Sequence, residues 1–220
     1  MSTIALFALA FSLGAAHALD ADHILTVSTL ASHKTSWRQA LGYAMHWALG
    51  HGLTILSVGS LVLLLGMAIP SQLSHAAELV VGGVIIFLGL HVWWDLRKKE
   101  AHFHYHAHDS MPTHAHWHSH QQARHHHAHH HRPLMIGALH GLAGSSPLLA
   151  ILPASQLSSH WLGMLYLGLF SFGVLLTMLA FGGFLGQAFW HLNQRGWMRA
   201  TRFTIGALAV AVGTHMLLFA

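Results

Sequence analysis

The chain has 220 residues, of which 54% are hydrophobic and only 7% carry a formal charge. This is too little charge for the surface of a soluble globular protein, so the composition indicates an integral membrane protein surrounded by a lipid bilayer. The formal net charge of +4 does not indicate a nucleic-acid partner, because the ten Lys and Arg residues fall in three short segments between apolar stretches.

Six apolar stretches follow one another along the chain, and each is long enough to cross a bilayer as a helix of about 20 residues. The first begins without basic residues and runs directly into a polar motif, so we expect a spanning helix rather than a cleaved signal peptide. The predicted fold is all-α, a polytopic membrane bundle of six transmembrane helices at residues 4–31, 40–68, 77–96, 134–153, 160–190 and 203–220.

The basic residues lie only in the connections that follow the first, third and fifth stretches. With six spans these three connections share one side of the membrane, and basic connections are typical of the cytoplasmic side. The sequence therefore predicts a protein of the cell (inner) membrane, with both termini outside and the long connection between the third and fourth spans in the cytoplasm.

The two halves of the chain carry similar patterns. His17 lies in Gly-Ala-Ala-His-Ala-Leu and is matched by His140 in Gly-Ala-Leu-His-Gly-Leu, 123 residues later. Three spans in each half would make the two repeats inverted, and transporters built in this way bind their substrate near the midplane between the halves. We therefore expect a first three-helix repeat at residues 1–96, a cytoplasmic His-rich loop at 97–133 and a second three-helix repeat at 134–220.

The first span contains His-Ala-Leu-Asp-Ala-Asp-His at residues 17–23, in an otherwise apolar stretch. A charged residue at the centre of a bilayer costs about 2.5–3.5 kcal/mol, so two acids here imply an interaction partner or a functional role. On an intact helix His17, Asp20 and His23 fall within one arc of about 120° and face one side. Asp22 points away from them, and it either joins the site where the helix unwinds or accepts a hydrogen bond that fixes a histidine tautomer. The alternative is that these buried polar groups satisfy one another or cap a broken helix.

Histidines also occur in the other spans. In the second, His46 and His51 are about 140° apart around a helix, so one regular helix would not direct both to a single ion. His51 lies between two glycines and is the stronger ligand candidate, while His46 is also consistent with a core or gating role. His91 and His215 lie near span ends and are interpreted as interfacial or packing residues. The candidate metal-binding residues are His17, Asp20, Asp22, His23, His46, His51 and His140.

The connection at residues 101–131 holds 14 of the 25 histidines and has almost no apolar residues to form a core. It is predicted to be disordered and to bind metal weakly at many places, as a cytoplasmic buffer, sensor or hand-off segment. The chain has no cysteine, which excludes disulfides and thiolate metal sites. The remaining imidazole and carboxylate ligands suit nickel, cobalt or zinc better than copper(I).

The motif His17-x4-Asp22-His23 closely resembles the signature of the nickel/cobalt transporter family. Leu-Gly-His-Gly-Leu-Thr around His51 is similar to that family's second-span motif, and His-Gly-Leu-Ala-Gly-Ser at His140 is similar to a motif of its shorter, urease-associated nickel permeases. The resemblance implies that His17, Asp22 and His23 select and transport the ion and that His51 contributes. Six spans and a glycine after Leu-Gly-His depart from the larger members of the family and favour the shorter branch.

These observations together predict a membrane permease, not an enzyme, that takes up Ni²⁺ or Co²⁺ as substrate and holds no permanent cofactor. No P-loop is present, so the energy would come from an ion gradient, the membrane potential or a partner, and a cytoplasmic metallochaperone is an expected partner. The alternatives are an efflux permease with the His-rich loop as its collector, a non-transporting metal sensor or chaperone, and an intramembrane metalloenzyme. The last lacks a general-base motif such as His-Glu-x-x-His.

Overall fold

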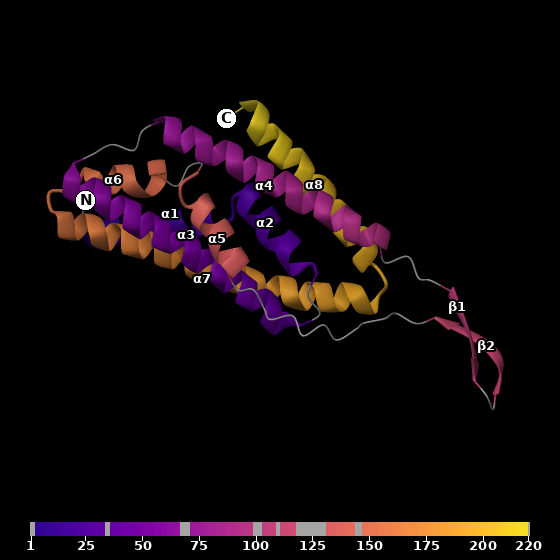
Figure 1. The fold of residues 1–220 in the computed structure, drawn as a ribbon. Coiled ribbons are helices and arrows are strands. Elements are labelled where there is room, and N and C mark those ends of the chain that lie inside the picture. Colours follow the sequence, from indigo (N-terminus) through magenta and orange to yellow (C-terminus); the bar gives the residue numbers. More distant parts are fainter. Residues whose placement is uncertain are drawn as a thin grey trace.

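The computed structural model describes residues 3–33, 36–66, 71–98, 103–108, 111–117, 131–143 and 147–219. Nearly all of this part of the chain is helical, in an elongated bundle (Figure 1). The first half contains α1 (Thr3–His17), α2 (Ala21–Ala31), α3 (Trp37–Leu65) and α4 (Ser71–Lys98). The second half contains α5 (His131–His140), the π-helix η1 (Pro147–Ile151), α6 (Leu152–Ser155), α7 (His160–Gln194) and α8 (Met198–Phe219).

A helical membrane bundle is confirmed, but the count of six spans is not. Among the described residues, α3, α4, α7 and α8 are long and apolar enough to cross a membrane, and α1 with α2 makes a fifth span if this pair, bent by 55°, is counted as one. The expected fourth span is not one continuous helix. Its first part, α5, has ten residues and is about 15 Å long at 1.5 Å per residue, half of a bilayer core.

Part of the His-rich loop, which the sequence predicts to be disordered, is described in the structure. Two antiparallel strands, β1 (Phe103–His108) and β2 (Met111–Trp117), form a hairpin that pairs Phe103 with Trp117. The hairpin extends away from the helices (Figure 1). The rest of the prediction, at residues 101–102, 109–110 and 118–130, lies outside the described residues.

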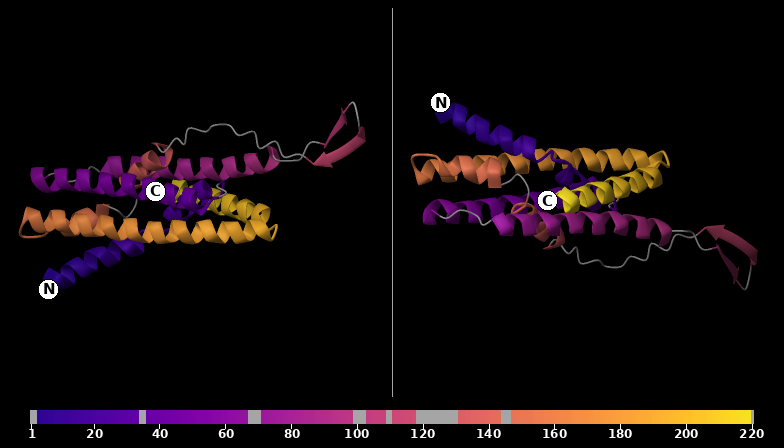
Figure 2. Two further views of the ribbon diagram at one scale, coloured as in Figure 1. Left: turned by 90° about the horizontal axis from the view of Figure 1, so that it is seen from below. Right: turned by 90° about the horizontal axis from the view of Figure 1, so that it is seen from above.

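The two halves pack through equivalent helices that run in opposite directions. In the α3–α7 pair, Gly52 faces Ser171, whereas Gly182, later in α7, faces Ala44, earlier in α3. The α4–α8 pair is also antiparallel, and both pairs run side by side in Figures 1 and 2. An antiparallel contact between each helix and its equivalent is what an inverted repeat requires.

Glycines at repeat-related positions let the helices approach closely. A Cβ on Gly14 of α1 would overlap the Phe170 carbonyl of α7, and a Cβ on Gly137 of α5 would overlap the Trp47 carbonyl of α3. Gly137 is 123 residues after Gly14, and Phe170 is 123 residues after Trp47, so exchanging the halves converts one contact into the other. Small residues are typical of such close approach in membrane helices. Each half therefore places its first helix against the longest helix of the other half.

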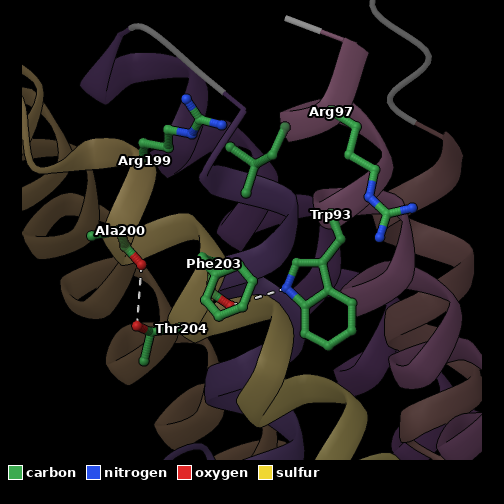
Figure 3. Close-up of a pocket in the computed structure, with 7 residues that line it drawn as sticks. Trp93, Arg97, Arg199, Ala200, Phe203 and Thr204 are labelled. Carbon is green, nitrogen blue, oxygen red and sulfur yellow. Dashed lines mark hydrogen bonds between the residues drawn. The ribbon is translucent and has the colours of Figure 1, made fainter. Parts of the chain in front are cut away.

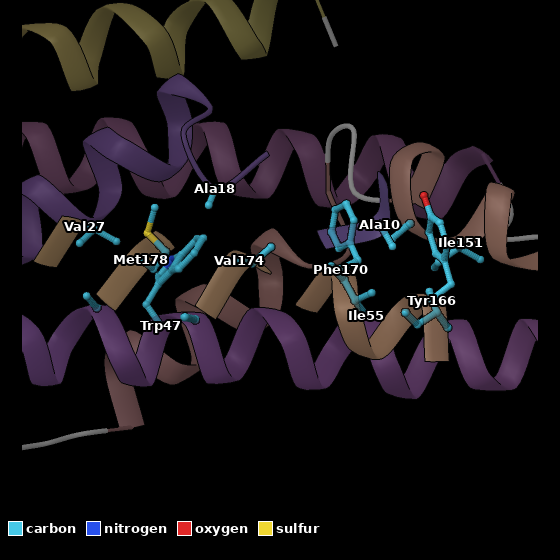
Figure 4. Packing of buried hydrophobic residues seen from close by; sticks show 14 of the residues in the cluster. Ala10, Ala18, Val27, Trp47, Ile55, Ile151, Tyr166, Phe170, Val174 and Met178 are labelled. Atoms are coloured by element: carbon cyan, nitrogen blue, oxygen red, sulfur yellow. The ribbon is translucent and has the colours of Figure 1, made fainter. Parts of the chain in front are cut away.

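Large side chains fill the interior between α3 and α7. Trp47, Phe170, Val174 and Met178 are fully buried, and Val27 of α2 packs on the same cluster (Figure 4). The outward faces of the long helices carry exposed apolar side chains instead, as expected for a surface in contact with lipid. Examples are Leu64, Phe87, Trp94, Phe184 and Phe203.

Candidate metal centre

The predicted polar motif lies at a break between two helices. α1 ends at His17 and α2 begins at Ala21, so the intact helix assumed in the sequence argument is not present. Asp20 occupies the position that caps α2, but its carboxylate makes no capping hydrogen bond. It accepts a hydrogen bond of 2.8 Å from Nδ1 of His17 instead. At this break, therefore, the Asp20 carboxylate bonds to the His17 ring and does not make the usual N-cap hydrogen bond of a helix.

Three histidines from three helices meet at this break. The rings of His17 and His23 are 4.5 Å apart between centroids, and the His51 ring of α3 lies 5.3 Å from the first and 5.1 Å from the second. One nitrogen of each ring lies within 4.8 Å of the others, a separation at which one ion could bind all three. All three side chains are buried. Tertiary packing therefore gathers candidates that are up to 34 residues apart.

Hydrogen bonds orient two of these rings in the way that metal ligands require. Nδ1 of His17 donates to Asp20, and Nδ1 of His23 donates to the main-chain carbonyl of His17 at 2.8 Å. A proton on Nδ1 leaves the Nε2 lone pair free to bind a metal, and a carboxylate or carbonyl behind the ring is the usual partner of a metal-bound histidine. Asp20 therefore suits an orienting role better than direct ligation.

The Nε2 atoms of His17 and His51 are 3.3 Å apart, close enough for one to donate a hydrogen bond to the other. Two nitrogens bound to one tetrahedral ion at 2.0–2.1 Å are separated by about 3.3–3.4 Å. An ion could therefore replace the shared proton with little movement of either ring. Octahedral coordination would bring the same two atoms to about 3.0 Å, which is a small adjustment.

His140 lies beside the three histidines but is not one of that group. Its ring lies 5.5 Å from the His23 ring, and its Nε2 atom is 3.2 Å from the hydroxyl of Thr26 on α2. Trp47 closes the apolar side: its indole stacks on His51 at 5.2 Å and also contacts the rings of His23 and His140. Sequence reasoning missed Thr26 and Trp47. Thr26 could have been found from its spacing, because it lies one turn after His23 on the same helix.

An acidic cavity leads toward the three histidines. It has a volume of about 250 Å³ and is lined by His17, Asp20, Ala21, Asp22, Ala143, Val212 and Met216. Asp22 lies in the first turn of α2, and its carboxylate is 3.8 Å from Nε2 of His23. Asp20, Asp22 and His23 form a second arrangement that can hold an ion. The two acids thus present negative charge between the open cavity and the buried histidines.

Two half-helices also end at the site. α1 ends at His17 and α5 ends at its repeat partner His140. The C-terminal end of a helix carries roughly half a negative charge, from carbonyl groups without intrahelical partners. Helix ends that meet at the middle of a membrane protein are a common way of holding a cation. The N-terminal end of α2 at Ala21 carries the opposite partial charge, so the negative field at this break comes from the two C-terminal ends together with the carboxylates of Asp20 and Asp22.

His46 is the candidate that the structure separates from the others. Its Nδ1 atom donates to the Gly42 carbonyl at 2.6 Å, and the metal-competent groups found among the described residues do not include it. The two glycines that flank His51 had made it the preferred candidate of this pair, and in the structure it is His51 whose ring lies beside those of His17 and His23.

A larger cavity, of about 740 Å³, lies between the ends of α4 and α8 (Figure 3). Trp93, Arg97, Arg199 and Phe203 are part of its lining, and the indole nitrogen of Trp93 donates to the Phe203 carbonyl at 3.1 Å. Two arginines and no carboxylate or imidazole make this lining unsuitable for a metal cation.

Comparisons with known proteins agree with a membrane protein of this kind. Residues 23–215 match the family model described as the cytochrome c biogenesis protein transmembrane region. The urease accessory protein UreH of Bacillus sp. (strain TB-90) is 31% identical over 187 residues, which cover 84% of this chain and 78% of UreH. No solved structure matches the chain. The predicted resemblance to a urease-associated branch is confirmed by this relative, and the protein, a relative of UreH, belongs to the family described as the cytochrome c biogenesis protein transmembrane region.

Proposed function

We propose that the protein is a membrane permease that carries Ni²⁺ or Co²⁺ through a site formed by His17, His23 and His51. The observation that carries this proposal is the set of three buried imidazoles, with ligand atoms within 4.8 Å of one another, at a helix break. Asp20 orients His17, and Asp22 attracts the hydrated ion and helps to replace its water. Imidazole and carboxylate ligands together suit nickel and cobalt.

Uptake is the proposed direction of transport. The basic segments that follow α2, α4 and α7 meet at one end of the bundle, because His33 contacts Asp95 and Arg202 also approaches Asp95. If this end is cytoplasmic, as basic connections indicate, both termini face outside. The acidic cavity is lined by Val212 and Met216, which lie toward the other end of α8. It would then collect the cation from outside.

The name of the matching family raises a different function, in thiol or haem chemistry. Electron transfer between thiols needs paired cysteines. This chain has none. Its own residues therefore support metal transport without a catalytic reaction, and UreH, as a urease accessory protein, is a relative consistent with such a role.

The remaining features follow from this proposal. Residues 1–96 and 134–220 would be the two repeats that hold the ion between them, and residues 97–133 would be a cytoplasmic segment that exchanges metal with the site or with a metallochaperone. The protein would lie in the cell membrane. Efflux remains the alternative direction, with the same site and the cytoplasmic segment as the collector.

Transport by the purified protein in liposomes tests the proposal. Radiolabelled nickel and cobalt should enter protein-containing vesicles faster than empty ones, and zinc, manganese and iron added as competitors define the selectivity. Accumulation in intact cells decides the direction. Absence of transport by folded protein, under either sign of the membrane potential and either pH gradient, would contradict the proposal.

A further inference from the structure

A second cluster of metal-ligating side chains lies away from the centre, where α2 and α4 meet. His33 follows the end of α2, and its Nδ1 atom is 3.1 Å from a carboxylate oxygen of Asp95. His91, one turn before Asp95 on α4, places its ring 5.7 Å from the His33 ring. Ligand atoms of these three residues lie within 4.8 Å of one another. His91, expected from the sequence to be an interfacial or packing residue, is thus part of a possible metal-binding group.

We propose that His33, His91 and Asp95 form a second binding site for the same divalent transition metal, at the basic end of the bundle. This site rests on the proposed transport function, as the place where an ion leaves the three buried histidines for the cytoplasm. Its ligands are again imidazole and carboxylate, the combination that suits nickel and cobalt. His91 and Asp95 are four residues apart on one helix and therefore face the same side.

A neighbouring arginine would compete with a metal ion for these ligands. Arg202 of α8 is buried, its guanidinium contacts Nδ1 of His33, and it lies 3.9 Å from the Asp95 carboxylate. A partly buried carboxylate needs a positive partner, and the guanidinium supplies one. An arriving metal ion would have to displace Arg202, so binding is weakened by the cost of breaking that pair. Weak binding is what the last site on a transport route requires, because the ion must also leave.

Three buried hydroxyl groups, on α2 and at its C-terminal cap, lie between the two sites. Thr26 contacts His140 beside the centre, the Thr29 hydroxyl donates to the Thr26 carbonyl at 2.8 Å, and the Ser32 hydroxyl donates to the Thr29 carbonyl at 2.9 Å. All three side chains are buried. Their oxygens keep lone pairs that can accept hydrogen bonds from water or contact a cation. From His23 to His33 the route is about 15 Å long at 1.5 Å per residue.

Because the chain has no cysteine, an introduced cysteine can give a spectroscopic signal of bound metal that the histidines of the loop cannot give. Cobalt bound to a thiolate gives a charge-transfer absorption that cobalt bound to imidazole does not, so in this chain it reports only an introduced cysteine. We expect this absorption when Co²⁺ is added to purified full-length Asp95→Cys or His91→Cys. Trp94→Cys, on the same helix next to Asp95 but outside the cluster, is the matched control and should give none.

The third ligand and the centre are then varied separately. Adding His33→Ala to Asp95→Cys should weaken cobalt binding at least tenfold, whereas adding His17→Ala should leave the absorption in place. A separate second site would be overturned if neither folded cysteine variant showed the absorption, or if Trp94→Cys showed it equally. It would also be overturned if His33→Ala had no effect on cobalt binding, or if His17→Ala abolished the absorption. Because this measurement needs no transport, a wild-type protein that fails to move nickel would contradict the proposed function and not the second site.

Discussion

Nε2 of His17 and Nε2 of His51 lie 3.3 Å apart, although the two residues are 34 positions apart in the chain and belong to different helices. Their separation matches two corners of a tetrahedral site with metal–nitrogen bonds of about 2.0–2.1 Å. Asp20 holds the opposite nitrogen of the His17 ring at 2.8 Å. This three-residue arrangement is the basis of the predictions about transport.

The two histidines of α3 make a matched pair of variants. His51→Ala removes a buried ring from the proposed site, and we expect nickel transport in proteoliposomes to fall at least about tenfold, on the scale of losses at metal sites. His46→Ala removes a ring that is bonded to the Gly42 carbonyl outside the site and should keep transport within about twofold. Equal loss in both variants at equal amounts of folded protein would remove the reason for placing His51 in the site.

The two aspartates should act differently. Asp22→Asn keeps the size of the side chain but removes negative charge 3.8 Å from His23, so we expect strongly reduced nickel transport. Asp20→Asn keeps an oxygen that can accept the His17 hydrogen bond, so it should reduce transport less, about 10-fold or below. Rates measured over a range of nickel concentrations separate weaker binding from slower transport. Wild-type rates in Asp22→Asn would show that this acid has only a structural role.

A third prediction concerns the helix contacts that the two halves share. Gly14→Ala would place a Cβ against the Phe170 carbonyl, and we expect the free energy of unfolding to fall by about 1–3 kcal/mol. Gly168→Ala, a change of the same size on α7 where nothing lies within 4 Å, is the control and should be nearly neutral. Thermal unfolding in detergent measures both. Gly137→Ala should behave as Gly14→Ala does, since the two contacts are equivalent in the repeat.

The orientation in the membrane can be measured with single cysteines in this cysteine-free chain. Ser155→Cys, exposed at the end of α6, should react in intact cells with a thiol reagent that does not cross membranes. Asn193→Cys, near the end of α7 at the basic end of the bundle, should react only after the cells are opened. The reverse pattern would invert the proposed topology, and with it the argument for uptake.

Removing residues 102–131 should leave nickel transport in place, because none of the proposed ligands lies in this segment. We expect a changed metal tolerance of cells or a changed apparent affinity, since the deletion removes 14 histidines. Transport in proteoliposomes and growth at raised nickel concentration measure the two effects. A deletion variant that is inserted and folded yet inactive would show that the segment takes part in transport itself.

The sequence was sufficient to determine the class of the protein and most of its candidate ligands. A scarcity of charge over long apolar stretches is a property of composition and requires a bilayer, whatever the packing. The polar motif at residues 17–23 stood out because buried acids are costly in a membrane. The repeat between His17 and His140 was visible as well, since equivalent helices keep their small residues where they pack closely.

Three features depended on the tertiary structure. A helical wheel assumes a continuous helix, so it could not show the break after His17, where the carboxylate of Asp20 bonds to the His17 ring and does not cap α2. The fourth apolar stretch has enough residues to span but is interrupted after α5, which hydropathy does not detect. The cluster of His33, His91 and Asp95 joins the end of one helix to the face of another. Contacts between residues distant in the chain depend on how the helices pack, and no local pattern in the sequence records that packing.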